Sequence, residues 1–196
     1  MHYYLIDKPF DLLSQFTREV PTHRTLADLP FDFPKDVYPV GRLDRDSEGL
    51  LILTNDPQVN QRLLQPSRNH RRAYLVQVEG VPTAAALEQL RTGVELRISK
   101  KNFRTRPAEV VLLDAPPTLP ERNPPVRYRA AIPTAWLELT LTEGKNRQVR
   151  KMGAAVGFPV LRLVRQSIQN LSREDMGGEV VREIGQKELW NKLGWG

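Results

Sequence analysis

Residues 38–56, YPVGRLDRDSEGLLILTND, place a cluster of charges directly before a wholly apolar run. The run Leu50–Leu53 predicts a buried strand, with Gly49 in front of it and Asp56-Pro57, a typical helix start, behind it. The charged residues therefore lie on a loop that a rigid strand supports. Catalytic groups are common on such loops, because a charged side chain there stays reachable and is still held in place. Asp44 is the leading candidate for a catalytic group.

Two kinds of site that use clustered acids are disfavoured by the spacing. A calcium loop would use Asp44, Asp46 and Glu48 as ligands. Its twelfth position, however, is Asn55, where a bidentate glutamate is needed, so we reject this loop. An aspartyl-phosphate site should follow an apolar parallel strand, but residues 40–43 are short and include an arginine.

A third kind of site fits the loop better. Asp44 would be a single ionised carboxylate beside Arg42 and Arg45, acting on a sugar or a base without metal or phosphate. A solvated, salt-bridged turn with no catalytic role is the alternative that spacing alone leaves open.

The composition indicates a globular protein with a polyanionic partner. Its 196 residues are 40% hydrophobic, which can fill the core of one large domain or two small ones. The formal net charge is +6, as expected for a protein that binds a polyanion. The chain has no cysteine, and His2, His23 and His70 show no ligand spacing, so we expect no metal site.

The sequence contains no membrane signal. No apolar stretch approaches the length of a membrane span, and the N-terminal residues lead into a strand-like run without a signal peptide. We therefore expect a cytoplasmic protein with no membrane partner.

Short strands and a few helices alternate along the chain. Strands are predicted at residues 3–6, 12–16, 50–53, 74–79, 135–142, 160–168 and 179–184, and within 94–114 around a turn at 99–102. Helices are predicted at residues 57–64, 84–92, 145–156 and 189–193, with a short one from residue 25. The Pro-rich residues 114–132 predict an extended surface loop. These patterns favour a mixed α/β (α+β) fold with a largely antiparallel sheet.

Basic residues gather in three segments. The first holds Arg62, Arg68, Arg71 and Arg72, and the second Arg97, Lys100, Lys101, Arg104 and Arg106. The third, residues 145–173, has seven basic residues and no acid, a bias that folding does not require. In the helix predicted there, Arg147, Arg150 and Lys151 would share one face. An ordinary amphipathic surface helix explains this spacing equally well.

Gly41-Arg42-Leu43-Asp44, then four residues, then Gly49-Leu50-Leu51, resembles the catalytic signature of the RsuA-type ribosomal RNA pseudouridine synthases. Thr54-Asn55 follows in the family's order, and the similarity extends from Lys8-Pro9 to about Ser167. The Pro-rich residues 122–125 and 132–134 resemble the subtype that modifies large-subunit (23S) ribosomal RNA.

The resemblance implies a fold and a domain organisation. The sheet would be curved and in two halves, with flanking helices and an active site in a central cleft. Residues 1–196 would form a single catalytic domain of two subdomains, with residues 170–196 as a C-terminal extension. Many relatives carry a small RNA-binding domain ahead of the catalytic one, and Lys8-Pro9 comes too early to leave room for it.

The reaction implied by the resemblance breaks the N1–C1′ bond of a uridine, turns the uracil and rejoins it through C5. It involves no redox change and needs no energy input, so no cofactor is expected. Asp44 would be the carboxylate that acts as nucleophile or base. Attack on C1′, attack on the base and removal of a C2′ proton all remain open.

The resemblance also implies roles for four further residues. Tyr74 matches the tyrosine that stacks on the flipped base, with Arg72 where a lysine is usual. Arg150 matches the arginine that pairs with the catalytic aspartate, and Leu163 the apolar residue that packs on the base. Arg42 matches the arginine that enters the gap left by the flipped nucleotide or holds its phosphate. A half-buried strand tyrosine and a core leucine are the structural alternatives for Tyr74 and Leu163.

Ribosomal RNA, with 23S ribosomal RNA favoured, is thus the expected partner of a monomeric protein. The residues expected to bind it are Lys8, Arg68, Arg71, Arg72, Lys100, Lys101, Arg147, Arg162 and Arg165. The alternative function is a non-catalytic RNA-binding or ribosome-assembly protein that uses the same basic segments.

Overall fold

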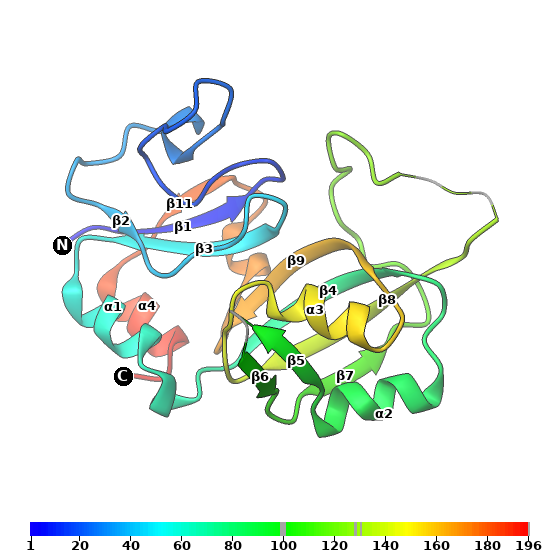
Figure 1. Cartoon of the computed structure of the whole chain (residues 1–196). Coiled ribbons are helices and arrows are strands. Elements are labelled where there is room, and N and C mark those ends of the chain that lie inside the picture. The colour runs from blue at the N-terminus through cyan, green and yellow to red at the C-terminus, as the bar shows by residue number, and fades with distance from the viewer. Residues whose placement is uncertain (99–100, 128, 130, 196) are drawn as a thin grey trace. The chain divides into compact units, whose positions relative to one another are not determined.

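The computed structural model describes residues 1–98, 101–127, 129 and 131–195. The chain divides into two compact units, shown in Figure 1. Unit 1 comprises Met1–His70 and Arg165–Gly196, and unit 2 comprises Arg71–Val164. Strand β9 (Val160–Ile168) begins in unit 2 and ends in unit 1.

The strands of unit 1 have the order β11-β1-β3-β9, and β1 pairs antiparallel with both of its neighbours. Its elements are β1 (Tyr3–Lys8), η1 (Leu26–Asp28), β2 (Tyr38–Pro39), β3 (Glu48–Thr54), α1 (Pro57–Leu64), η2 (Pro66–Arg68), β10 (Leu171–Ser172), η3 (Arg173–Met176), β11 (Val181–Glu183) and α4 (Gln186–Lys192). Leu5 of β1 pairs with Ile52 of β3 and with Arg182 of β11. All seven residues of β3 are buried, because strands flank it on both sides and both of its faces are covered. A strand covered in this way has an uninterrupted apolar sequence.

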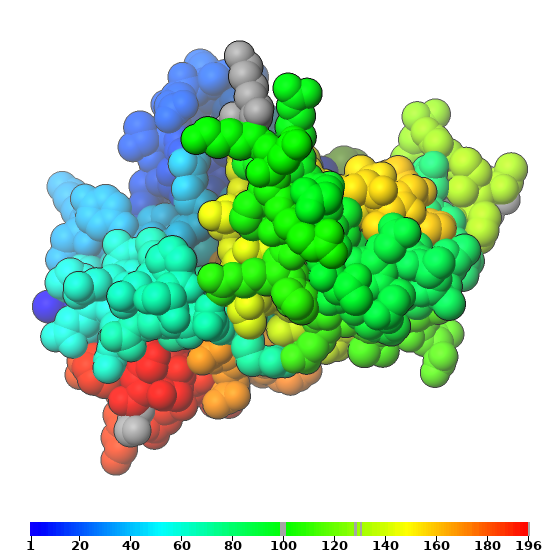
Figure 2. Space-filling view, turned by 60° about the horizontal axis from the view of Figure 1, so that its bottom comes forward, coloured from blue at the N-terminus to red at the C-terminus, as the bar shows by residue number. Residues whose placement is uncertain are grey.

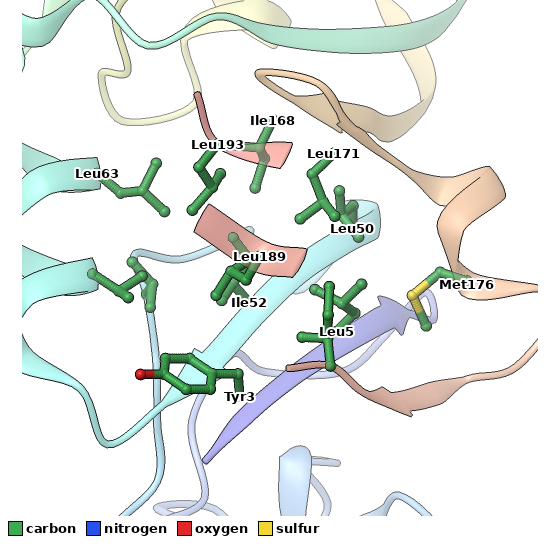
Figure 3. Packing of buried hydrophobic residues seen from close by; sticks show 13 residues of the cluster. Tyr3, Leu5, Leu50, Ile52, Leu63, Ile168, Leu171, Met176, Leu189 and Leu193 are labelled. Carbon is green, nitrogen blue, oxygen red and sulfur yellow. The ribbon is translucent and has the colours of Figure 1, made fainter. Parts of the chain in front are cut away.

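One face of this sheet packs against α1 and α4. In Figure 3, Tyr3, Leu5, Leu50 and Ile52 meet Leu189 and Leu193. Helix α1 begins where expected, since Asp56 Oδ1 accepts from Gln58 N at 2.9 Å and proline follows the cap. The segment 170–196 supplies five buried side chains of this cluster, namely Leu171, Met176, Ile184, Leu189 and Leu193.

The other face is covered by the Pro-punctuated segment between β1 and β2. Phe31 and Phe33 make edge contacts with the Tyr4 ring, at centroid distances of 5.2 and 5.4 Å, a geometry that aromatic pairs prefer. The strand predicted at residues 12–16 is wrong, because only Leu13 pairs there, through one bridge to Thr25. The short helix predicted from residue 25 is the single turn η1.

Unit 2 has the strand order β9-β4-β8-β7. Besides the start of β9, the unit contains β4 (Arg72–Glu79), α2 (Ala84–Thr92), β5 (Glu95–Ile98), β6 (Lys101–Arg104), β7 (Glu109–Leu112), β8 (Thr134–Leu141) and α3 (Gln148–Ala155). β4 and β8 pair over eight residues, from Arg72 with Leu141 to Glu79 with Thr134. Their inward side chains, with those of α2, α3 and β9, form a second hydrophobic cluster that includes Val76, Leu87, Leu139, Met152 and Leu163. The turn predicted at residues 99–102 lies partly outside the described residues.

Helix α3 starts three residues later than predicted. Arg147 precedes its first turn with φ +52°, and this left-handed conformation ends any helical continuity with Lys145. The Gln148 side chain instead accepts from Lys145 N at 3.0 Å and donates to Glu143 at 2.7 Å. Arg147 therefore does not share a helical face with Arg150 and Lys151, contrary to the prediction.

The Pro-rich loop between β7 and β8 has no helix or strand among its described residues, as predicted. Arginine side chains hold its backbone. Arg122 donates to Pro124 O and Pro125 O, at 2.8 and 3.0 Å. Arg162 Nη2 donates to Pro120 O at 2.9 Å. The loop is thus tied to β9 by guanidinium groups.

The antiparallel pairings and the flanking helices confirm the predicted α+β class. The predicted cleft depends on how the two units are placed and stays a prediction. No helix in the described ranges is both long and apolar enough to cross a membrane.

Candidate active site

The loop that carries Asp44 is fixed by a buried serine from another part of unit 1. Ser14 Oγ donates to Leu43 O at 2.9 Å and accepts from Leu43 N at 3.1 Å. On the other side, Asp44 O accepts from Ser47 N at 3.0 Å, which closes a turn. The backbone is therefore held on both sides of Asp44, while its side chain is only half-buried. A reactive carboxylate needs this combination of a fixed position and access.

Gly49 determines how the chain leaves this loop and enters β3. Its φ is +100°, and a Cβ built on it would lie 2.3 Å from Arg165 O and 2.7 Å from Arg165 N. Arg165 also donates from Nε to Leu50 O at 2.7 Å. Only glycine allows this backbone approach. The fold itself therefore requires a glycine at this position of the motif.

Lys8 lies beneath the loop and is 1% exposed. Its Nζ donates to Leu12 O at 2.6 Å and Pro9 O at 2.9 Å, and reaches Arg45 O at 3.5 Å. Burial lowers the pKa of Lys8 from 10.5 to about 7, against the attraction of Glu48, Asp46, Asp44 and Asp11. Lys8 was expected to bind RNA. In this structure its ammonium group is enclosed by backbone carbonyls, and a contact with RNA stays a prediction.

The lowered pKa of Lys8 predicts a pH-dependent stability. Between about pH 7 and 10.5 the unfolded chain binds a proton at Lys8 that the folded chain lacks. The free energy of unfolding contributed by Lys8 should then rise with pH, by up to about 1.4 kcal/mol per unit. Urea unfolding at pH 7.5, 8.5 and 9.5 should give a flatter pH dependence for Lys8→Met than for wild type.

The matched control for this measurement is Lys187→Met, which removes an exposed lysine of α4. Its pH dependence should follow that of wild type. Parallel curves for wild type and Lys8→Met would show that Lys8 keeps its charge in the folded protein.

The two arginines beside Asp44 have different surroundings. Arg45 Nε donates to Asp11 Oδ1 at 2.5 Å. Arg42 is exposed and donates from Nη2 to Gln15 Oε1 at 3.3 Å. A long hydrogen bond from an exposed guanidinium group to an uncharged amide is easily exchanged for one to a phosphate, so Arg42 can still meet RNA.

In unit 2 the structure brings Tyr74 and Leu163 into the same hydrophobic cluster. Tyr74 is half-buried on β4, and Leu163 is buried on β9. In the protein without RNA, Tyr74 is thus a half-buried strand tyrosine and Leu163 a core leucine, as the structural alternatives state. Arg150 is half-buried on α3 and donates from Nη1 to Val160 O at 3.3 Å, which ties it to β9. Its predicted pairing with Asp44 would join the two units and stays a prediction.

The remaining residues expected to bind RNA differ in their exposure. Arg68, Arg71, Lys101 and Arg147 are exposed, Arg72 is half-buried, and Lys100 lies outside the described residues. Arg71 makes a two-bonded pair with Glu109, at 2.5 and 2.6 Å, which also raises the pKa of Arg71. Arg162 and Arg165 are only 9% and 5% exposed. Both guanidinium groups bond to backbone carbonyls, and the RNA contacts expected of these two arginines stay predictions.

Within the described ranges, no three His, Cys, Asp or Glu side chains gather so that they could hold a metal ion. Sequence reasoning missed two residues that shape the Asp44 loop, Ser14 and Gln15. Each contacts the loop across more than 25 positions of the chain. No local pattern marks such residues.

Residues 2–155 match the model of a family described as RNA pseudouridylate synthase. The chain is 54% identical over 180 residues to a ribosomal large subunit pseudouridine synthase E of Vibrio vulnificus, covering 92% of this chain and 74% of the relative. It is also 54% identical over 165 residues to the protein of that name in Xanthomonas axonopodis pv. citri, covering 84% of both.

A more distant relative is the ribosomal large subunit pseudouridine synthase B of Bacillus subtilis, 31% identical over 187 residues, with 95% of this chain and 69% of the relative covered. Among solved structures, a crystal structure of a pseudouridylate synthase superposes with a TM-score of 0.76 at 27% identity. That superposition covers 98% of this chain and 73% of the other.

Proposed function

Because the chain belongs to the RNA pseudouridylate synthase family, we propose that it converts a uridine of large-subunit ribosomal RNA into pseudouridine. The names of the Vibrio and Xanthomonas relatives, more than half identical over most of both chains, support this substrate. The alternative of a non-catalytic RNA-binding protein is not favoured, because these relatives are named as enzymes.

The observation that carries the proposal is the anchoring of Asp44. Its loop is held by Ser14 on one side and by its own turn and Gly49 on the other. When the N1–C1′ bond of the uridine breaks, positive charge develops on the sugar. A fixed carboxylate stabilises this charge, or takes up a sugar proton, without first having to be oriented.

The atoms balance without a further reactant. The N1–C1′ bond breaks, the uracil turns, and a C5–C1′ bond forms while C5 loses a proton and N1 gains one. We therefore propose that the reaction uses no cofactor. The three routes for Asp44, namely attack on C1′, attack on the base and removal of a C2′ proton, share this balance.

Unit 2 supplies groups suited to the detached base. Tyr74 offers an aromatic face and Leu163 an apolar one, and both belong to one packed cluster. A base that stacks on such a surface can still turn, and it is kept from escaping. Arg42 would hold the displaced backbone, and the net charge of +6 attracts the RNA as a whole.

The test is the modification pattern of ribosomal RNA in cells that lack the gene. Carbodiimide treatment followed by primer extension along large-subunit RNA should show one stop in wild-type cells that is lost on deletion. A plasmid copy of the gene should restore it. An unchanged pattern across all ribosomal RNA would contradict the proposal.

A further inference from the structure

Unit 1 has a second surface feature that the proposed reaction does not use. A cavity of about 380 Å³ is lined by Gln58, Gln61, Arg62, Gln65, Arg68 and Trp190. These residues come from α1, its C-terminal end, η2 and α4. Figures 1 and 2 both show α1 beside the C-terminal helix. None of residues 41–47 lines the cavity.

The lining of the cavity brings hydrogen-bonding, cationic and aromatic groups together. It holds three amides, two guanidinium groups and one indole, and no carboxylate. Amides donate and accept hydrogen bonds, as the edges of a nucleobase require. Guanidinium groups bind phosphate, and an indole supports a base by stacking. The hydrophobic contact between the two helices is made by other residues, such as Val59, Leu63 and Leu189.

The wall of the cavity is pre-organised. The Arg62 guanidinium carbon lies 5.5 Å from the centroid of the Trp190 ring and 4.9 Å from that of Trp195. The two indoles make an edge contact at 6.3 Å. His70 holds the backbone of Arg62 through a hydrogen bond of 2.9 Å from its Nε2. A ligand therefore meets a fixed arginine rather than having to immobilise a flexible one.

We propose that this cavity binds an unpaired nucleotide of the RNA substrate, outside the catalytic site. Arg62 and Arg68 meet its phosphate, and the glutamine amides meet its base. The proposal rests on the proposed function in taking large-subunit ribosomal RNA as the ligand. RNA fits the lining better than an acidic peptide does, because a peptide carboxylate would leave the indole and the amides unused.

The test compares two single-charge variants of the full chain. Gln61→Glu puts a carboxylate into the cavity from an exposed helix position. Gln89→Glu makes the same change at an exposed position of α2 in unit 2. The dissociation constant is measured by filter binding at fixed salt, with a transcript of large-subunit ribosomal RNA. We expect about a tenfold loss of affinity for Gln61→Glu and less than about twofold for Gln89→Glu.

A second measurement uses the wild-type protein and needs no variant to fold. The same transcript, substituted with 4-thiouridine, is irradiated in complex with the protein, and the peptides are analysed by mass spectrometry. A crosslink in residues 188–192, the tryptic peptide of Trp190, supports the proposal. Equal affinities for the two variants together with no crosslink in this peptide overturn it.

Pseudouridine formation by the wild type on the transcript is scored separately. A protein that forms none contradicts the proposed function. The affinity ratio of the two variants still decides whether the cavity binds RNA.

Discussion

Replacing Asp44 by asparagine should lower the single-turnover rate of pseudouridine formation by at least about 10⁴-fold. The asparagine keeps the size of the side chain and its ability to accept a hydrogen bond. It removes the negative charge that meets the sugar cation or takes a proton. The backbone contacts made by Ser14 and Ser47 do not involve the carboxylate, so the loop should keep its conformation.

Tritium release from RNA labelled at C5 of uridine measures the chemical step directly, because forming the C5–C1′ bond expels this hydrogen. Affinity for RNA should stay within a few-fold of wild type, since a carboxylate repels a polyanion. Asp46→Asn is the matched control, as it removes the same charge from the same half-buried loop and should stay within about tenfold. Near wild-type tritium release by Asp44→Asn would show that another group performs the reaction.

Gly49→Ala should strongly lower the stability of the protein. Alanine at φ +100° is strained by about 1–3 kcal/mol. Its Cβ would also overlap the backbone of Arg165, whose oxygen lies 2.3 Å from the built position. Together these effects predict a loss of about 3–5 kcal/mol from a free energy of unfolding that is typically about 5–15 kcal/mol. Urea unfolding monitored by circular dichroism measures the loss.

Gly157→Ala separates the two causes. Gly157 has φ +89°, close to that of Gly49, but a Cβ there meets nothing within 4 Å. The free energy of unfolding should fall by about 1–2 kcal/mol in Gly157→Ala, from backbone strain alone. If both variants lose the same amount, the close approach of β9 to Gly49 is relieved at no cost, and the motif glycine is required only for its φ.

The elements that were predicted correctly are those with short-range causes. Asp56-Pro57 starts α1, and Thr83 and Gly93 bound α2, because caps act within one turn of a helix. The buried strand at Leu50–Leu53 follows from an apolar run that has no other stable location. The prediction of a strand at residues 12–16 failed because groups of this segment bond to other parts of the chain instead of to a neighbouring strand. The Leu12 carbonyl accepts from the Lys8 side chain, and the Ser14 hydroxyl bonds to Leu43.

The basic residues show the same division. A charge pattern in the sequence indicates how strongly the chain attracts RNA but not which side chains face it. Lys8, Arg162 and Arg165 are buried because backbone carbonyls of Leu12, Pro120 and Leu50 lie within their reach. For Arg162 and Arg165 the accepting carbonyls belong to segments that are distant in sequence, and for Lys8 they belong to the turn that follows β1. In none of the three cases does the charge pattern of the sequence anticipate the burial.

The sequence by itself therefore determined the family, the position of Asp44 on a loop before a buried strand, and the order of most helices and strands. These depend on a motif, on periodicity and on caps, all of which operate over a few neighbouring residues. Only the tertiary structure decided that Ser14 and Gly49 hold the Asp44 loop, that Lys8 lies beneath it, and that Arg62 stacks on two tryptophans. Each of these contacts joins residues far apart in the chain, and their energies exist only once the fold has brought the partners together.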